Sequence, residues 1–207
     1  MQFYDGFLGH EPDPLFNSRG HRCKELEDID LHKYILFAGD NVGVGWDKPI
    51  EETYPHIISK SLNMDYYNLS IFNGGLDSLK HNLLTWFNKV PQSPKAIVVS
   101  SEFLNSFLVC DKNYNGLKAC DLNDEHVQTV LDTGNVTGFW NARHIMLDRL
   151  INSYTSAQIY QIVFDTKTPA FSKNTVNIHH SGDMFDHVKI AEAFVSEIKK
   201  RMARVRP

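Results

Sequence analysis

The sequence has few cysteines and no long hydrophobic run, and these absences narrow the class of protein. The three cysteines, Cys23, Cys110 and Cys120, are odd in number and lack the spacing of a metal site. We expect free thiols in a protein made in a reducing cytosol. No stretch of about 18 apolar residues occurs, so the sequence predicts no membrane-spanning helix. The first residues, MQFYDGFLGHEPDP, do not resemble a secretory signal.

A strong excess of either charge is also missing. The net charge of -4 and the pI near 6.2 give no electrostatic reason to expect a nucleic-acid partner. The basic run KKRMARVR at 199–206 is interpreted as the last turns of a helix, where cations suit the helix dipole. With 42% hydrophobic and 22% charged residues, the chain has the composition of a globular protein rather than a disordered one.

Strand-like and helix-like segments alternate along most of the chain. Short apolar runs rich in β-branched residues predict strands, and apolar residues spaced three and four apart predict helices. Residues 165–184 are predicted to form a loop. The predicted strands are 34–38, 66–70, 95–101 and 158–164, and the predicted helices are 51–62, 78–90, 139–155 and 185–203.

This alternation predicts an α/β fold, a three-layer α/β/α sandwich with a mostly parallel, flavodoxin-like sheet. Residues 1–30, rich in Gly, Pro, Asp and charge, are predicted to form an extended N-terminal arm with little core of its own. Residues 31–207 form the single domain, with an insertion at 110–137 that is polar and hard to place. In such folds ligands bind at the carboxyl ends of the strands.

Small and polar residues occupy the turns at these predicted strand ends. They are Gly39-Asp40-Asn41, Asn73-Gly74-Gly75, Ser101-Glu102 with Asn105, and Asn177-Ile178-His179-His180. In order and spacing they resemble the blocks of the SGNH (GDSL-type) hydrolases, and the resemblance covers about residues 17–198. More narrowly, the chain resembles the SGNH-like proteins of tailed bacteriophages. That likeness rests on the N-S-x-G-x-R stretch at 17–22, TYPHIISKSLNMDYYNLS at 53–70 and HHSG…KIAEAF at 179–194.

The resemblance assigns a role to each block. In the family the first block carries a nucleophilic serine, and Gly39 and Asp40 match that block while Asn41 stands in the place of the serine. The last block, D-x-x-H, supplies the catalytic aspartate and the histidine base, which places Asn177 at the aspartate and His180 at the base. Asn73 or Gly74, together with Asn105, falls at the oxyanion-hole positions. The oxyanion hole and pocket are therefore expected to comprise Gly39, Asp40, Asn73, Gly74 and Asn105. A second register pairs Asp183 with His187, with one residue too many between them; we favour the first.

Two of the three triad positions are therefore asparagine, and this changes the chemistry. An amide nitrogen is not a nucleophile under these conditions, and asparagine does not stabilise a charged imidazolium as aspartate does. In serine proteases the second loss alone costs about 10⁴-fold. The resemblance thus implies a catalytically degenerate, phage-encoded protein, a virion decoration or glycan-binding protein. Its expected partners are other virion proteins or surface glycans. It would be made in the host cytoplasm without a signal peptide, without a membrane or nucleic-acid partner, and without a cofactor.

Three alternatives stay open. The chain would be an active esterase or deacetylase of acylated carbohydrates if His180 served a nucleophile elsewhere, for which Ser70, Ser100 and Ser101 are candidates. The run HHSGDMFDH at 179–187 contains metal-ligand residue types, so metal-dependent hydrolysis there is another alternative; because the H-E-x-x-H spacing is absent, the favoured interpretation has no metal site. Trp46 and Trp140 are interpreted as core or pocket wall, with stacking on a sugar as the alternative.

Overall fold

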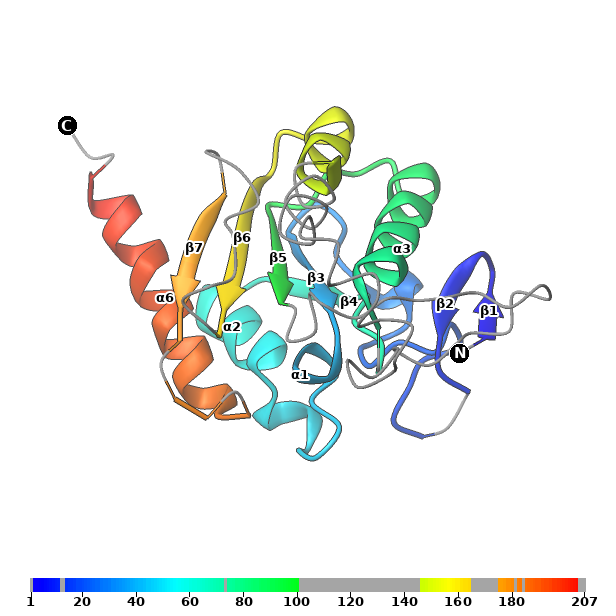
Figure 1. Ribbon diagram of the computed structural model, residues 1–207, viewed down its shortest axis with the longest axis horizontal. Coiled ribbons are helices and arrows are strands. Elements are labelled where there is room, and N and C mark those ends of the chain that lie inside the picture. The colour runs from blue at the N-terminus through cyan, green and yellow to red at the C-terminus, as the bar shows by residue number, and fades with distance from the viewer. Residues whose placement is uncertain are drawn as a thin grey trace, which may run out of the picture.

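The computed structural model describes residues 2–11, 14–72, 74–100, 146–164, 175–180, 182–183 and 185–204 (Figure 1). The predicted insertion at 110–137 lies outside these residues. The centre of the fold is a five-stranded sheet in the order β4-β3-β5-β6-β7, and every neighbouring pair is parallel. Its strands are β3 (Tyr34–Gly39), β4 (Asp65–Asn68), β5 (Ala96–Ser100), β6 (Gln158–Val163) and β7 (Val176–His179).

Helices cover both faces of this sheet, which confirms the predicted three-layer α/β fold (Figure 1). On one face, the Tyr54 ring of α2 lies 5.8 Å from the Phe37 ring of β3. On the other face, the Trp86 indole of α3 donates to the Tyr34 hydroxyl at 3.2 Å. The longer helices are α2 (Tyr54–Leu62), α3 (Leu76–Lys89), a helix through residues 146–154, and α6 (His187–Arg204); the short ones are α1 (Asn41–Val44) and the 3-10 turns Leu26–Asp28 and Ile50–Glu52.

Hydrophobic pattern explains why the central strands form where they do. Every residue of β3, YILFAG, is buried, as expected for a parallel strand covered on both faces. Pro55 lies in the first turn of α2, where its missing N–H costs no helical hydrogen bond. The four strands and the helices 51–62, 78–90 and 185–203 predicted from sequence are thus confirmed within a few residues at their ends.

The last part of the chain departs from its prediction. The segment 165–184, predicted as a loop, contains the edge strand β7, which is only four residues long and alternates buried and exposed side chains. Helix α6 begins at His187, and Asp186 caps it by accepting the Lys189 N–H at 3.1 Å. Asp183 accepts the Phe185 N–H at 3.0 Å within the preceding turn.

Helix α3 also begins earlier than predicted. Gly75 is its N-cap, so Ser78 lies inside the first turns, where it is buried. The helix therefore gains its first residues without a side-chain cap, and its stability comes from packing against the sheet rather than from its end.

The first thirty residues fold onto the domain instead of extending from it. An antiparallel hairpin joins β1 (Gln2–Tyr4) to β2 (Phe7–Gly9) through Asp5 and Gly6, both of which have positive φ. Asp-Gly is a strong signal for this two-residue turn, and the arm prediction overlooked it. The Phe7 side chain is completely buried beside the Trp86 ring, and the Leu8 N–H donates to Asn82 Oδ1 of α3 at 2.8 Å. This segment is part of the core.

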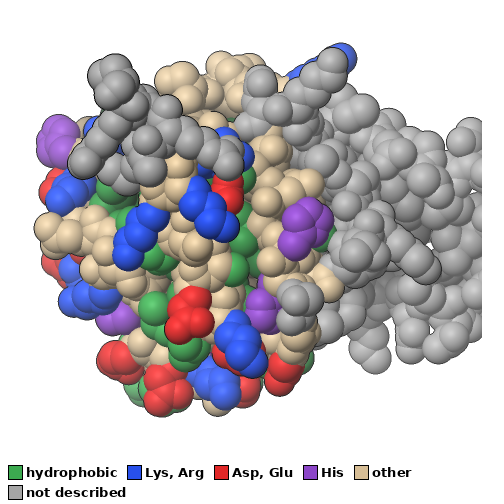
Figure 2. Space-filling view, turned by 90° about the vertical axis from the view of Figure 1, so that its left-hand side faces the viewer, with side chains coloured by type: hydrophobic (Ala, Val, Ile, Leu, Met, Phe, Trp, Pro, Cys, Tyr) green, Lys and Arg blue, Asp and Glu red, His purple; other side chains and the backbone are tan. Residues whose placement is uncertain are grey.

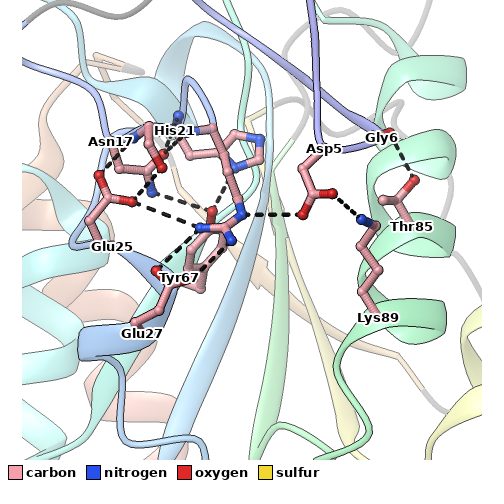
Figure 3. A network of polar contacts seen from close by, with 11 residues as sticks. Asp5, Gly6, Asn17, His21, Glu25, Glu27, Tyr67, Thr85 and Lys89 are labelled. Atoms are coloured by element: carbon pink, nitrogen blue, oxygen red, sulfur yellow. Dashed lines mark hydrogen bonds and ion pairs between the residues drawn. The ribbon is translucent and has the colours of Figure 1, made fainter.

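A polar network holds the rest of the N-terminal segment in place (Figure 3). Asn17 Oδ1 accepts the N–H groups of Arg19 and His21, both at 3.0 Å, and so closes the turn of the N-S-x-G-x-R stretch. The His21 ring lies 3.0 Å from the Tyr67 hydroxyl of β4. Arg19 forms an ion pair with Glu27 at 2.9 Å, and Asp5 pairs with Lys89 of α3 (Figure 3). The stretch therefore has a structural role.

The face formed by α2 and α6 is a mixed, charged surface. Figure 2 shows Lys and Arg side chains interspersed with Asp and Glu, with hydrophobic groups in small areas between them. Such a surface is typical of a solvated face rather than of a binding patch. Within the described part of the chain, no helix has both the length and the apolar character needed to cross a bilayer.

Candidate functional site at the carboxyl edge of the sheet

The turn that follows β3 forms the centre of the site. The strand ends at Gly39, Asp40 is the N-cap of α1, and Asn41 is the first residue of that helix. The helix is a single turn, closed by hydrogen bonds from the Val44 N–H to the Asp40 carbonyl and from the Gly45 N–H to the Asn41 carbonyl, both at 3.0 Å. Asp40 is buried and Asn41 half-buried, so Asn41 occupies the strand-to-helix position that the resemblance assigns to a nucleophile.

Two serines fill the space beneath this turn. A Cβ at Gly39 would overlap Ser100 Oγ, and a Cβ at Gly43 would overlap Ser70 Oγ. Glycine is required at both positions because the ends of the neighbouring strands approach the turn so closely. Ser70 and Ser100 are 1% and 0% exposed. Neither hydroxyl is accessible to a substrate, so these two candidates for a displaced nucleophile lie in the floor of the site.

Tyr54, at the start of α2, connects the floor to α6. Its hydroxyl lies 2.6 Å from Ser100 Oγ, and its backbone N–H donates to Nδ1 of His187 at 3.1 Å. The rings of Tyr54 and His187 stack with centroids 5.7 Å apart. Burial raises the pKa of Tyr54, which keeps the phenol neutral near pH 7. The phenol is therefore a hydrogen-bonding group here and not a base.

His187 is held in one neutral form. Because Nδ1 accepts the Tyr54 N–H, the hydrogen of the neutral ring lies on Nε2. Among the described residues, no acceptor pairs with that buried Nε2. Burial lowers the pKa of His187, while the nearby Asp47 carboxylate acts in the opposite direction. The result is a buried imidazole against the residues that follow Asn41.

Arg22 and Asn68 fix the far end of α1. Arg22 is almost completely buried and donates to the carbonyl of Val44 at 3.1 Å, and also to those of Gly45 and Lys48. Asn68 Nδ2 donates to the Gly43 carbonyl at 2.9 Å. These donors satisfy carbonyls that a helix end leaves without intrahelical partners. The sequence signal for Arg22 is the last position of N-S-x-G-x-R, but its role in holding the turn could not be read from the sequence.

The two predicted triad remnants at the end of the chain are not hydrogen-bonded to each other. Asn177 lies within β7, paired with Gln161 of β6, and its buried Oδ1 has no hydrogen-bond partner among the described residues. His180 follows the strand, and its Nε2 lies 2.8 Å from the Asp183 carbonyl. A carbonyl only accepts, so Nε2 carries the hydrogen and is not available to take a proton from a nucleophile.

The residues of the alternative register, Asp183 and His187, are not hydrogen-bonded to each other either. The Asp183 carboxylate accepts the Phe185 N–H and is not hydrogen-bonded to His187. His187, rather than His180, is the histidine in contact with Tyr54 beside the Asn41 turn. No group of three or more His, Cys, Asp or Glu side chains suited to a metal ion occurs among the residues that the structure describes.

The remaining predicted site residues are only partly described. Gly74, after β4, is buried, and its N–H donates to the Ile71 carbonyl at 3.0 Å. Asn73, Asn105 and Ser101 lie outside the described residues.

Comparison with known proteins supports the fold. No protein-family model matches the sequence, and no curated protein matches it significantly. Among solved structures, a lipolytic G-D-S-L family protein from Veillonella parvula has a TM-score of 0.54 and 10% identity, covering 81% of this chain and 98% of that one. A carbohydrate esterase family 2 enzyme from Corynascus thermopiles has a TM-score of 0.54 and 12% identity, covering 83% of this chain and 67% of that one.

A third similar structure is the psychrotrophic esterase EstA from Pseudoalteromonas sp., solved with monoethylphosphonate as inhibitor. It has a TM-score of 0.52 and 11% identity, covering 83% of this chain and 99% of that one. The chain thus has the α/β fold of the SGNH (GDSL-type) hydrolases. At these identities the likeness establishes the fold alone.

Proposed function

We propose that this protein is a catalytically degenerate member of the SGNH hydrolases that keeps the strand-end site for binding a glycan and performs no serine acyl transfer. One observation carries the proposal: Asn41 occupies the first position of α1 directly after β3. Ser100 and Ser70, whose hydroxyls lie against Gly39 and Gly43 of the same turn, are buried. An amide at that position donates and accepts hydrogen bonds but does not attack an ester.

The rest of the site supports binding over acyl transfer. Serine hydrolysis needs a histidine nitrogen that accepts the nucleophile's proton and a carboxylate that orients the ring. His180 uses Nε2 toward the Asp183 carbonyl, and His187 uses Nδ1 toward the Tyr54 N–H. Neither imidazole is hydrogen-bonded to a carboxylate side chain in the described part of the chain. The Asn41 amide, which donates and accepts hydrogen bonds, suits a ligand rich in hydroxyl groups.

The biological setting that we propose follows from the phage-type motifs. The N-S-x-G-x-R stretch and the HHSG…KIAEAF segment favour a phage-encoded protein, made in the host cytoplasm, that decorates the virion or binds surface glycans there. Within this proposal we favour the glycan-binding role, because the structurally similar Corynascus protein is described as a carbohydrate esterase with a carbohydrate-binding domain.

Fluorophosphonate labelling tests the proposal without knowledge of the substrate, since the probe needs only an activated serine. We expect intact-mass spectrometry to find no adduct on the purified protein, under conditions in which EstA, which monoethylphosphonate inhibits, is labelled. A single labelled serine whose labelling is lost in His180→Ala would overturn the proposal. That result would establish the alternative, an active esterase acting through His180.

A further inference from the structure

Four aromatic side chains form a cluster beside the Asn41 turn, and we call it the aromatic platform. His10 and Phe16 come from the N-terminal segment, Trp46 follows α1, and Phe72 follows β4. The His10 and Phe16 rings stack at 4.6 Å, and those of Phe16 and Trp46 at 5.8 Å. Phe72 completes the cluster, with its ring 5.9 Å from that of Trp46. Residues distant in sequence are therefore brought to the same edge of the sheet as Asn41.

The platform is both exposed and rigidly held. Trp46 is 51% exposed and Phe72 40%, while Phe16 beneath them is buried. Nε2 of His10 accepts the Phe72 N–H at 2.8 Å, which ties the ring of His10 to the turn after β4. Large aromatic rings exposed next to one another are costly on a solvated surface and are typical of binding sites. A prearranged aromatic surface loses little conformational entropy when a ligand binds.

A groove of about 600 Å³ begins at Trp46 and supplies polar groups next to the rings. Its charged lining residues are Asp47, Lys48, Glu51 and Arg22. Because the Arg22 guanidinium is buried against backbone carbonyls, the exposed rim has no excess of positive charge. This volume is within the range of small-ligand sites, roughly 300–1,000 Å³. Such a rim does not favour a phosphate or a nucleic acid, both of which need an excess of positive charge. It does offer donors and acceptors to a neutral ligand with many hydroxyl groups.

We infer that the aromatic platform binds a neutral oligosaccharide, with one sugar ring stacked on Trp46, the Phe72 ring inclined at 45° beside it, and the sugar hydroxyls directed to the groove. A pyranose ring has an apolar face of C–H groups and a rim of hydroxyls, which matches aromatic rings beside a polar groove without an excess of positive charge. The inference deepens the proposed function and rests on it, because it names the ligand class and the residues that recognise it. The platform is distinct from the Asn41 turn that it borders.

The test measures binding of neutral gluco-, xylo-, manno- and N-acetylglucosamine hexasaccharides by titration calorimetry. We expect at least one of them to bind the wild-type protein, and Trp46→Ala and Phe72→Ala each to weaken that binding at least tenfold. Tyr154→Ala is the matched control, because Tyr154 is an aromatic residue of similar exposure, 45%, in the helix that precedes the amino end of β6. It is expected to bind like the wild type.

Two results would overturn the inference. One is that the wild type binds no hexasaccharide of the panel at millimolar concentration. The other is that both platform variants, shown by circular dichroism and thermal unfolding to be folded, bind as tightly as the Tyr154→Ala control. The second result would leave the proposed function standing, with the ligand held elsewhere. Conversely, a labelled serine in the phosphonate experiment would remove the proposed function while leaving the platform a recognition surface for a substrate.

Discussion

The Tyr54 hydroxyl and Ser100 Oγ lie 2.6 Å apart in the interior, joining the first turn of α2 to the end of the central strand β5. Both side chains are completely buried, so neither hydroxyl exchanges this partner for water. The pair positions α2 against the floor of the site. The contribution of this hydrogen bond can therefore be measured as a change in the free energy of unfolding.

Removing the Tyr54 hydroxyl is expected to destabilise the protein. Tyr54→Phe leaves Ser100 Oγ buried without this partner, which typically costs about 1–3 kcal/mol in the free energy of unfolding. Adding Ser100→Ala removes the stranded group, so the double variant should lose less than the sum of the two single variants. Urea unfolding measures all three, with Tyr154→Phe as the exposed control. A Tyr54→Phe variant as stable as that control would contradict the role of the pair.

Arg22 is expected to be irreplaceable by lysine. Its planar guanidinium reaches the carbonyls of Val44, Gly45 and Lys48 together, whereas a lysine ammonium has one compact charge that does not span them. We expect Arg22→Lys to lower the free energy of unfolding by about 3 kcal/mol, because hydrogen bonds to charged groups contribute about 1.5–3 kcal/mol each. Amide hydrogen exchange of residues 41–48 should accelerate.

The control for Arg22 is Arg201→Lys, which changes an exposed arginine paired with Glu197 at 2.9 Å. Exposed pairs contribute little, so this variant should change stability by less than about 1 kcal/mol. Equal effects of the two substitutions would show that Arg22 does not hold the turn.

Acid is expected to destabilise the protein through His21. The ring is fully buried between the Tyr67 hydroxyl and the Leu8 carbonyl, and burial lowers its pKa to about 3. Between pH 6.5 and the folded-state pKa of about 3, the unfolded chain binds a proton at His21 that the folded chain does not bind. The free energy of unfolding therefore falls as the pH falls. One such group accounts for about 1.4 kcal/mol per pH unit. The lowered pKa of His187 acts in the same direction.

Unfolding experiments between pH 6.5 and 5, above the range in which carboxylates titrate, restrict the effect to histidines, among which His56 and His187 also have lowered pKa values. His21→Asn should have a shallower dependence, by about one proton, than the wild type. An unaltered slope in His21→Asn would mean that the buried ring is not the group that titrates.

Gly20 and Gly6 form a matched pair for a steric test. Both have positive φ, 72° and 86°, but a Cβ at Gly20 would overlap the His10 backbone while one at Gly6 would meet only side-chain atoms at 3.5 Å or more. We expect Gly20→Ala to cost several kcal/mol and Gly6→Ala about 1 kcal/mol, the cost of the left-handed conformation alone. Thermal unfolding of both variants measures the difference. Equal destabilisation of the two variants would show that the His10 backbone shifts to make room for the added Cβ.

The sheet was largely predictable from sequence because its central strands are continuous apolar runs. β3 and β5 are buried on both faces, so every position carries the signal. The edge strand β7 was missed because only Val176 and Ile178 are buried in it. The N-terminal hairpin was missed because composition outweighed the Asp5-Gly6 turn signal.

The site was less predictable than the sheet. The sequence placed Asn41 after β3 correctly because strand and turn are adjacent in the chain. It gave no indication that Tyr54 and His187 meet, since this contact spans 133 residues and depends on how α2 and α6 lie together. The aromatic platform likewise joins three segments that are separate in the chain, so no local sequence pattern predicts it.

The N-terminal hairpin also has a consequence for the order in which the chain folds. The hairpin and the residues that follow it contact residues far along the chain. Tyr67 is 46 residues beyond its partner His21, and Lys89 is 84 residues beyond its partner Asp5. During synthesis the first thirty residues therefore leave the ribosome long before the surface that receives them exists, and such long-range closure is slow. Nascent chains arrested before α3 has emerged should be cleaved by protease within this segment, and longer ones protected. These residues would therefore be synthesised before their partners and would pack after them.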